Sequence, residues 1–386
     1  MVSLESAENA LKSFYLDAVR DALDLKTSPF LAKVERSTDN VYGKDVKKLI
    51  RIGLHGGVMA GTEAGDLPQT DKSNYAQLTI GLKNLYGTIE ISDKAIRASQ
   101  SNEGAFVNLL NGEMDNLLKS AKYHFARMLM GDGKGRVAKI DGWVDDQHLK
   151  VYATSGLAIG MRVFLRDENG ETMDNNEERT IVAIDREKLL VEFSGSTVPD
   201  DINSGYICCS TEADELTGLE ALYSDSVYGL TEETYAKIKP AEIYLESDID
   251  EIVIQKMIDL LEESSGSAPN LIICSAGVRR ALLQYYMDMS ITPKAMEIEG
   301  GFQALDFNGI PVVADRFCPH GTMYFINTDD FKLYQLCDWQ WMESEDGKIL
   351  RQIPGKPVYT ATLVKYAELV CTRPNGVGRL VNIPEV

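Results

Sequence analysis

The sequence predicts an α+β protein with more than one hydrophobic core. Two strand patterns flank a long glycine-rich connection, residues 103–130 carry one helical stripe, and residues 137–212 show only β-type runs. The chain has 386 residues, roughly two to three times the length of an ordinary single domain. Because 44% of these residues are hydrophobic, the composition is that of a globular protein able to bury several cores.

Charge and the absence of sorting signals exclude several classes of protein. The 59 acidic and 39 basic side chains leave a net charge of −20, which argues against a protein that coats nucleic acid by neutralising phosphates. No window approaches ~18 consecutive apolar residues, and Met1 to Ala10 lacks a basic-then-apolar signal pattern. The 6 cysteines all lie in the second half, which suits reduced thiols better than a disulfide framework. We therefore expect a soluble protein that is not secreted and has no membrane partner.

Residues 1–45 are expected to form an N-terminal arm. Apolar residues recur at helical spacing, so the arm is predicted to begin with an amphipathic helix that stops before Pro29. This stripe consists of Leu4, Ala7, Leu11, Phe14, Ala18, Ala22 and Leu25. A lone helix of this kind needs a partner surface, and from Ser28 to Gly43 the apolar pattern is lost.

A small basic cluster follows Gly43, at the end of the arm and the start of the next segment. It consists of Lys44, Lys47, Lys48 and Arg51. Two interpretations stay open, a solvated strand edge and a contact with an acidic neighbour.

Residues 46–90 are predicted to form an extended hairpin. Ile50, Ile52 and Leu54 alternate with polar residues, as do Ala76, Leu78, Ile80 and Leu82 on the second strand. The connection between them is far longer than the two to five residues that close an ordinary hairpin, and each arm of ~10 residues would reach roughly 30 Å. Such a loop is either disordered or ordered by a partner, so its tip is our candidate assembly site. The candidate residues are Gly61, Glu63, Asp66, Leu67, Pro68 and Lys72.

Residues 91–213 contain a long helix and then a stretch of short strands. Asn102 can cap a helix over residues 103–130 that is ~42 Å long and ends at Gly131. The following Gly-Asp-Gly-Lys-Gly segment lacks the ending of a phosphate-binding loop and comes after a helix, so we interpret it as a junction. Residues 136–213 are predicted to be a small inserted β-barrel. Between positions 137 and 212 fifteen acidic residues face seven basic ones, so we expect this barrel to lie in solvent.

Beyond residue 213 strands and helices alternate, which predicts an α/β layer. Ser247 and Ser275 are expected to cap helices, and an apolar strand precedes Ser275. Asn308-Gly309 between two apolar runs predicts a type I′ hairpin. Further strands are expected over 323–327, 332–336, 360–371 and 379–383.

No constellation of side chains calls for an enzyme. The four histidines lie far apart, so neither a metal site nor a cofactor site is expected. Cys318 and His320 are the one thiol and imidazole pair that is local in sequence, and a buried thiol beside a loop histidine is the simpler interpretation. The acidic pairs Glu262-Glu263 and Asp329-Asp330 are expected to be solvated carboxylates. The prediction is a non-enzymatic protein without cofactors.

The order of these parts resembles the tailed-bacteriophage major capsid protein family, which has the Hong Kong 97-type capsid fold. The resemblance covers roughly residues 40–135 and 214–386, and its weight comes from the order of motifs that carry no catalytic signature. The stretches that carry it are Gly61-Thr62-Glu63 through Leu67-Pro68, Tyr75-Ala76-Gln77, Leu85-Tyr86-Gly87, Glu90-Ile91-Ser92, Arg127 to Gly135, Phe307 to Val313, and Gly321 to Asn327.

The resemblance implies an assignment for each part of the chain. The hairpin would be the family's extended loop and the long helix its spine helix. The implied divisions are an arm (1–45), the extended loop (46–90), the spine helix of the peripheral domain (91–135), the inserted barrel (136–213), the continued peripheral domain (214–255), the axial domain (256–330), and peripheral and axial strands (331–386).

The resemblance also implies a function. The chain would form hexamers and pentamers of an icosahedral head shell around double-stranded DNA that is enclosed without being specifically bound. A separate scaffolding protein and a portal protein are implied partners, with assembly in the host bacterial cytoplasm and a final location in the virion. Other readings are an encapsulin shell enclosing an enzyme cargo, an acid/base hydrolase, which would need a pocket, and a cell-surface adhesin, which would need a secretion signal.

Overall fold

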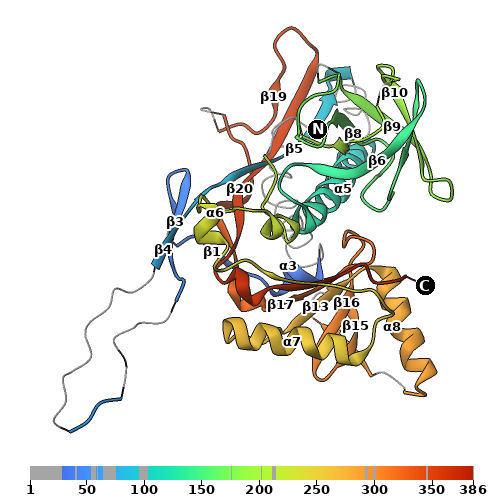
Figure 1. Ribbon diagram of the computed structural model, residues 1–386. Helices are drawn as coiled ribbons and strands as arrows, with labels where there is room; N and C mark the ends of the chain where they lie inside the picture. Colours follow the sequence, from blue (N-terminus) through green and yellow to red (C-terminus); the bar gives the residue numbers. More distant parts are fainter. Residues whose placement is uncertain are drawn as a thin grey trace.

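The computed structural model describes residues 28–39, 41–53, 58, 60–63, 75–94, 103–174, 176–200, 202–210, 214–291, 294–298, 301–344 and 347–385. Three packed parts and one projecting hairpin make up this structure (Figure 1). A central sheet carries the long helix, a second sheet lies below it with two helices, and a barrel lies beside the long helix. The predicted amphipathic helix of residues 1–25 lies outside the described residues, as does Asn102, the predicted cap of the long helix.

The central sheet has five strands drawn from both ends of the chain. They are β1 (Glu35–Ser37), β5 (Lys83–Ser92), β18 (Phe331–Trp341), β19 (Arg351–Gln352) and β20 (Val358–Cys371). β20 pairs antiparallel with β18 and β5, whereas β1 lies parallel to β18. The long helix α5 (Glu103–Met130) matches the predicted span and packs on this sheet, with the ring of Phe125 at 6.1 Å from that of Trp339.

Residues 28–34, which precede β1, lie between the two sheets, and we call this segment the wedge. Its sequence shows no apolar pattern. Ser28 caps the short helix α3 (Pro29–Lys33), and its hydroxyl also donates to Asp315 at 3.2 Å. Phe30 and Leu31 are fully buried, and the Phe30 ring meets Phe331 of β18 edge-on at 5.0 Å. One main core therefore contains the wedge together with residues of both sheets.

The projecting hairpin pairs as its alternating pattern predicts. β3 (Asp45–Arg51) runs antiparallel to β4 (Tyr75–Gly81), and β2 (Val41–Tyr42) adds a short edge. The register runs from Asp45↔Gly81 to Arg51↔Tyr75, so Leu54 lies beyond the strand and outside the described residues. One face of the pair is buried and contains Val46, Ile50, Ala76, Leu78 and Ile80.

The lower sheet has seven strands in the order β12-β21-β17-β13-β16-β15-β14. Their bounds are β12 (Ala241–Tyr244), β13 (Leu271–Cys274), β14 (Ala295–Ile298), β15 (Phe302–Phe307), β16 (Ile310–Ala314), β17 (Met323–Ile326) and β21 (Gly378–Val381). The helices α7 (Glu251–Ser265) and α8 (Ala276–Asp288) cover one face with their own core, and the opposite face joins the main core. The predicted turn is present, since Asn308 and Gly309 both have positive φ.

The predicted helix cap at Ser247 is wrong. Helix α7 begins three residues later, because Asp250 has an extended backbone and its carboxylate accepts the amide of Val253 at 2.7 Å. The predicted cap at Ser275 is confirmed, with its hydroxyl accepting the amide of Val278 at 3.2 Å.

Residues 136–208 form a closed barrel with a separate core. Its strands close in the order β10-β7-β6-β11-β8-β9. They are β6 (Arg136–Asp145), β7 (His148–Val151), β8 (Arg162–Arg166), β9 (Arg179–Asp185), β10 (Leu190–Gly195) and β11 (Tyr206–Cys208). The two ends of the barrel meet, because the amide of Cys209 donates to the carbonyl of Gly135 at 2.9 Å. The other short helices among the described residues are η2 (Glu220–Tyr223), α6 (Glu232–Tyr235), η3 (Thr328–Asp330) and η4 (Pro374–Gly376).

Candidate assembly interface

The outer face of the hairpin, defined as the side chains of Lys47, Leu49, Arg51, Tyr75 and Gln77, points away from the core. Strand alternation places these residues opposite the buried set, and all five are exposed. Leu49 is 65% exposed and Tyr75 is 58% exposed. Two large apolar groups flanked by two cations are thus available for contact with another molecule.

The structure divides the predicted basic cluster. Lys47 and Arg51 lie together on the outer face, and Lys44 is exposed at the turn between β2 and β3. Lys48 points to the opposite face, where its ammonium donates to the hydroxyl of Tyr334 on β18 at 3.1 Å. Lys48 therefore holds the hairpin against its own body, which linear sequence proximity alone did not reveal.

Part of the predicted tip is described. Gly61 and Glu63 are exposed. The other four candidate residues, Asp66, Leu67, Pro68 and Lys72, lie outside the described residues.

A cavity of about 620 Å³ lies at the root of the hairpin, where β4 leads into β5. Its lining includes Gly81, Lys83, Thr217, Tyr228 and Glu368. The hairpin is tied to this cavity through its backbone, because the amide of Thr79 donates to the carbonyl of Tyr228 at 3.0 Å. The tilt of β4 therefore depends on the loop that contains Tyr228.

Glu368 forms the buried floor of this cavity. Its side chain is 1% exposed, and one oxygen accepts the amides of Thr217 at 2.7 Å and Leu369 at 3.0 Å. Burial raises the pKa of Glu368 to about 8, and the nearby charge of Lys83 opposes this rise only partly. The carboxyl is thus largely protonated at neutral pH. Sequence reasoning missed it because Glu368 lies within an apolar strand.

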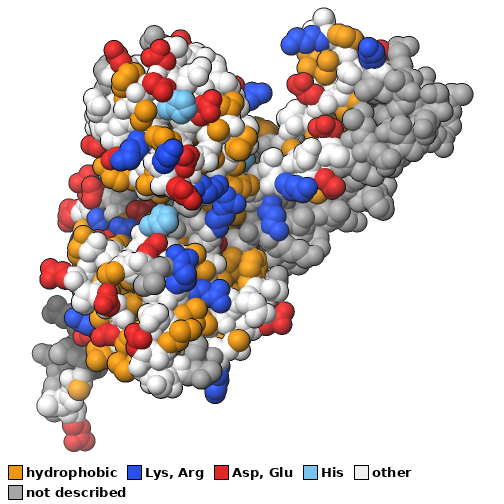
Figure 2. Space-filling model, turned by 90° about the vertical axis from the view of Figure 1, so that its right-hand side faces the viewer, with side chains coloured by type: hydrophobic (Ala, Val, Ile, Leu, Met, Phe, Trp, Pro, Cys, Tyr) orange, Lys and Arg blue, Asp and Glu red, His pale blue; other side chains and the backbone are white. Residues whose placement is uncertain are grey.

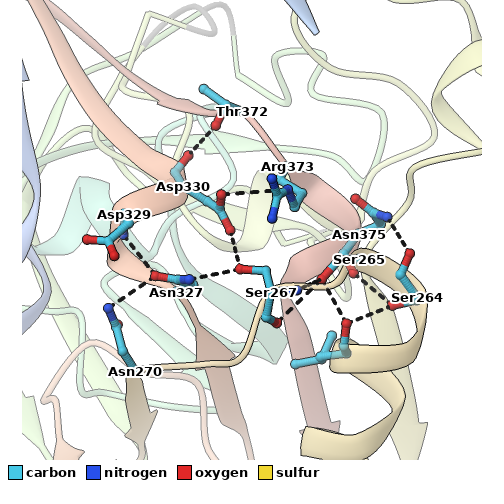
Figure 3. Close-up of polar contacts among 11 residues, drawn as sticks. Ser264, Ser265, Ser267, Asn270, Asn327, Asp329, Asp330, Thr372, Arg373 and Asn375 are labelled. Atoms are coloured by element: carbon cyan, nitrogen blue, oxygen red, sulfur yellow. Dashed lines mark hydrogen bonds and ion pairs between the residues drawn. The ribbon is translucent and has the colours of Figure 1, made fainter. Parts of the chain in front are cut away.

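The acidic pair Asp329-Asp330 belongs to a network of polar contacts that joins several elements of the fold. Asp330 accepts the hydroxyl of Ser267 at 2.7 Å and pairs with Arg373 at 3.8 Å (Figure 3). The amide of Asp329 donates to the side chain of Asn327 at 3.0 Å. These contacts join the end of α7 to the start of β18 and the end of β20.

The cysteines and histidines show no reactive pairing in the described part of the chain. The Cys318 thiol is buried, which raises its pKa, and His320 bonds to Glu385 at 2.9 Å instead of to the thiol. Burial also raises the pKa of Cys208 to about 12 and that of Cys209 to about 11. Within the described ranges there is no group of three His, Cys, Asp or Glu side chains that could hold a metal ion. No helix among those residues is long and apolar enough to span a membrane.

Solved structures share this architecture. A chain of the cyanophage A-1(L) capsid asymmetric unit matches with a TM-score of 0.56 and 10% identity, over 94% of this chain and 92% of that one. This chain has a phage capsid fold. The holo-SrpI encapsulin of Synechococcus elongatus PCC 7942 matches with a TM-score of 0.48 and 10% identity, over 93% and 88% of the two chains. Mycobacterium phage Bobi matches with a TM-score of 0.47 and 10% identity, over 99% and 98%.

Sequence comparison adds nothing to this assignment, since no protein-family model and no curated protein matches the chain. The capsid fold predicted from the order of motifs is confirmed through the structure. Because the identity is only 10%, the structural match shows a shared fold alone. The function has to be argued from the chain's own surfaces.

Proposed function

We propose that this chain is the major capsid protein of a tailed bacteriophage or prophage, forming hexamers and pentamers of an icosahedral shell around double-stranded DNA. The observation that carries the proposal is the hairpin on a capsid fold. It projects from the body and exposes Leu49 and Tyr75 beside Lys47 and Arg51 (Figure 1). Aromatic and arginine side chains of this kind are enriched where proteins meet.

A second copy of the chain is the proposed partner of the hairpin. Each copy has a net charge of −20, so a neighbouring surface supplies carboxylates for the cations at positions 47 and 51. Burial of Leu49 and Tyr75 against that surface would contribute roughly 25 cal/mol for each Å² of apolar area removed from water. The tip residues predicted from the sequence, from Gly61 to Lys72, would extend this contact.

The finer assignments follow from the same proposal. The barrel would be an inserted, outward-facing domain, and the seven-stranded sheet with its two helices would be the axial domain. A separate scaffolding protein and a portal protein would take part in assembly in the bacterial cytoplasm, with the finished protein in the virion. The chain would have no catalytic role.

Deletion of residues 61–72 tests the role of the hairpin. We expect the full-length chain to form closed shells in negative-stain images, and the deleted chain to remain folded by circular dichroism but to elute as small species. The double substitution Leu49→Ser with Tyr75→Ser should also prevent shells, whereas the control change Val182→Ser on the exposed surface of the barrel should not.

The outcomes separate the competing functions. Shells of normal size from the deleted chain would show that the hairpin is dispensable. A full-length chain that never forms shells would overturn the capsid function itself. Shells that enclose an enzyme and no DNA when isolated from their natural host would identify an encapsulin instead.

A further inference from the structure

The root of the hairpin contains a buried acid beside a cavity. Acidic side chains lie on the outside of the molecule on the face that Figure 2 shows, whereas Glu368 of β20 is only 1% exposed. Glu368 lines the cavity of about 620 Å³ together with Lys83, the first residue of β5. Asn84 and Tyr86 line the same cavity and are exposed, so the cavity reaches the surface and water can enter it.

The turn Tyr228-Gly229 holds the hairpin against the body, and we call these two residues the clamp. Tyr228 has a φ of +57°, a left-handed conformation that is strained for a tyrosine. Hydrogen bonds on both sides of this residue maintain it. Its carbonyl accepts the amide of Thr79 on β4 at 3.0 Å, and its hydroxyl donates to the carbonyl of Leu369 at 3.2 Å and accepts the amide of Cys371 at 3.0 Å. One residue thus connects the hairpin to β20.

The clamp and the cavity act on the same short piece of chain. Leu82 alone separates the end of β4 from Lys83 at the start of β5. A shift of Lys83 toward Glu368 would therefore pull on the end of the hairpin. The fit at the clamp is close, since a methyl group added at Gly229 would lie 3.1 Å from the carbonyl oxygen of Thr79. The hairpin therefore has little freedom to tilt while the clamp is closed.

The surroundings of Glu368 favour its uncharged form. Burial raises the pKa of Glu368 to about 8, although the nearby charge of Lys83 acts to lower it. Two amides, from Thr217 at 2.7 Å and Leu369 at 3.0 Å, donate to one of its oxygens. The titratable groups around it come from β5, the loop before η2, the clamp, β18 and β20, and they are Lys83, Asp214, Tyr228, Tyr334 and Cys371.

We propose that the clamp and Glu368 form a switch that sets the tilt of the hairpin, closed while Glu368 holds its proton and open once the proton has left for solvent. The carboxylate that remains is buried beside the cavity, which favours entry of water and approach of the ammonium of Lys83. Because Lys83 is joined to β4 through Leu82, this approach breaks the hydrogen bond from Thr79 to Tyr228. The strain at Tyr228 is then released.

The consequence for assembly rests on the proposed function. If the hairpin joins neighbouring subunits, a closed clamp presents its outer face at one fixed angle to the body. An open clamp leaves that angle variable, so a subunit with ionised Glu368 would be less able to assemble. Assembly would therefore be favoured below about pH 8, where the closed form predominates.

Hydrogen exchange of the unassembled subunit tests the switch. The reporter is the amide of Thr79, resolved from its neighbours by electron-transfer fragmentation, with each rate divided by the intrinsic rate at the same pH. With a pKa of about 8 in the closed form and the ordinary 4.5 in the open form, linkage lowers the closed-to-open ratio about tenfold between pH 7 and pH 9.5. We expect this fall in the natural chain and a change of less than about twofold in Glu368→Gln, which has no proton to lose. Equal pH dependence in the two chains would overturn the switch.

The neighbouring amides separate opening of the clamp from unfolding of the hairpin. Alternate amides of a strand point to opposite edges, so those of Leu78 and Ile80 face β3 while that of Thr79 faces the clamp. Opening of the clamp alone should leave Thr79 roughly tenfold less protected than Leu78 and Ile80 throughout the pH range. Equal protection of the three amides would mean that they open together by unfolding, which would also overturn the switch.

A change at the clamp itself provides the second measurement. Gly229→Ala places a methyl group against Thr79 at a φ of +71°, whereas the matched control Gly266→Ala has a similar φ of +66° and nothing within 4 Å of the added carbon. We expect Gly229→Ala to lower the protection of the Thr79 amide about fivefold at pH 7 and the control to change it less than about twofold. Natural protection in Gly229→Ala would show that the clamp does not hold β4.

The results also separate the switch from the proposed function, because the exchange is measured without shells. If the exchange follows the prediction but the natural chain forms no shells at any pH, the proposed function alone fails. If shells form but the exchange of Thr79 is the same in the natural chain and in Glu368→Gln, the switch alone is wrong. Shell yields should fall above about pH 8 for the natural chain and stay constant for Glu368→Gln, and an equal fall in both would contradict control of assembly by Glu368.

Discussion

Glu368→Gln should stabilise the subunit, and its effect should grow with pH. The pKa of Glu368 in the folded chain is about 8, against an ordinary value of 4.5 for an exposed glutamate. The folded state therefore binds a proton that the unfolded state has released, so the stability of the natural chain falls as pH rises between these two values. At ~1.4 kcal/mol for each pH unit, the loss is about 3 kcal/mol at pH 7 and about 5 kcal/mol above pH 8.

The amide of the variant carries no charge at any of these pH values, and its oxygen can still accept the amides of Thr217 and Leu369. We expect the variant and the natural chain to be equally stable below pH 4.5 and to diverge up to about pH 8. The assay is urea unfolding of the unassembled subunit at half-unit steps from pH 4 to pH 9.

A matched control separates the effect of burial from the loss of one negative charge. Glu263→Gln changes an exposed glutamate on α7, and its unfolding free energy should follow the natural chain within about 0.5 kcal/mol. Parallel pH curves for Glu368→Gln and the natural chain would refute the argument from burial. So would a variant that is less stable at every pH, since the carboxyl would then be charged and paired in the folded state.

Three further predictions concern other parts of the chain. Phe30→Ala should lower the unfolding free energy by about 3–5 kcal/mol in urea titrations, because the ring is fully buried in the wedge; a loss below 1 kcal/mol would show that the wedge is not part of the core. Replacing residues 136–209 by a short Gly/Ser linker should leave the rest folded, because the backbone hydrogen bond between Cys209 and Gly135 shows that the two ends of the barrel are close. The replacement should lower the melting temperature or change shell diameter, and a reproducibly insoluble product would contradict this. Boiled, reduced shells should run as one monomer band on a denaturing gel, because Lys72 near several acids is expected to be an ion pair and not a cross-linking nucleophile; a ladder that disappears in Lys72→Ala would disprove it.

Elements specified by local pattern could be predicted from the sequence. The alternation on both sides of the glycine-rich loop predicts β3 and β4, and the stripe over residues 103–130 predicts α5. The turn at Asn308-Gly309 needs only two adjacent residues that tolerate positive φ. In each case the residues that determine the element are neighbours in the chain, so the local sequence pattern is enough to predict it.

Features that depend on distant partners could not be predicted. Residues 28–37 show no apolar period, because their burial comes from β18, which is about 300 positions away in the chain. The different role of Lys48 within its cluster depends on Tyr334, and the raised pKa of Glu368 depends on its burial in the folded chain. The spacing of residues in the sequence does not show which distant residues come into contact, so these contacts are known only from the folded structure.

The pairing of β1 with β18 has a consequence for the order in which the chain folds. A ribosome releases residues 28–37 well before their partner strand, which begins at Phe331, so the central sheet cannot be completed until that strand has been made. The barrel has the opposite property. Its strands are contiguous and its two ends are hydrogen-bonded together, so it can close during synthesis. Until β18 has been made, Phe30 and Leu31 lack the core in which they are buried, and in this interval a nascent subunit is most prone to aggregate or to need a chaperone.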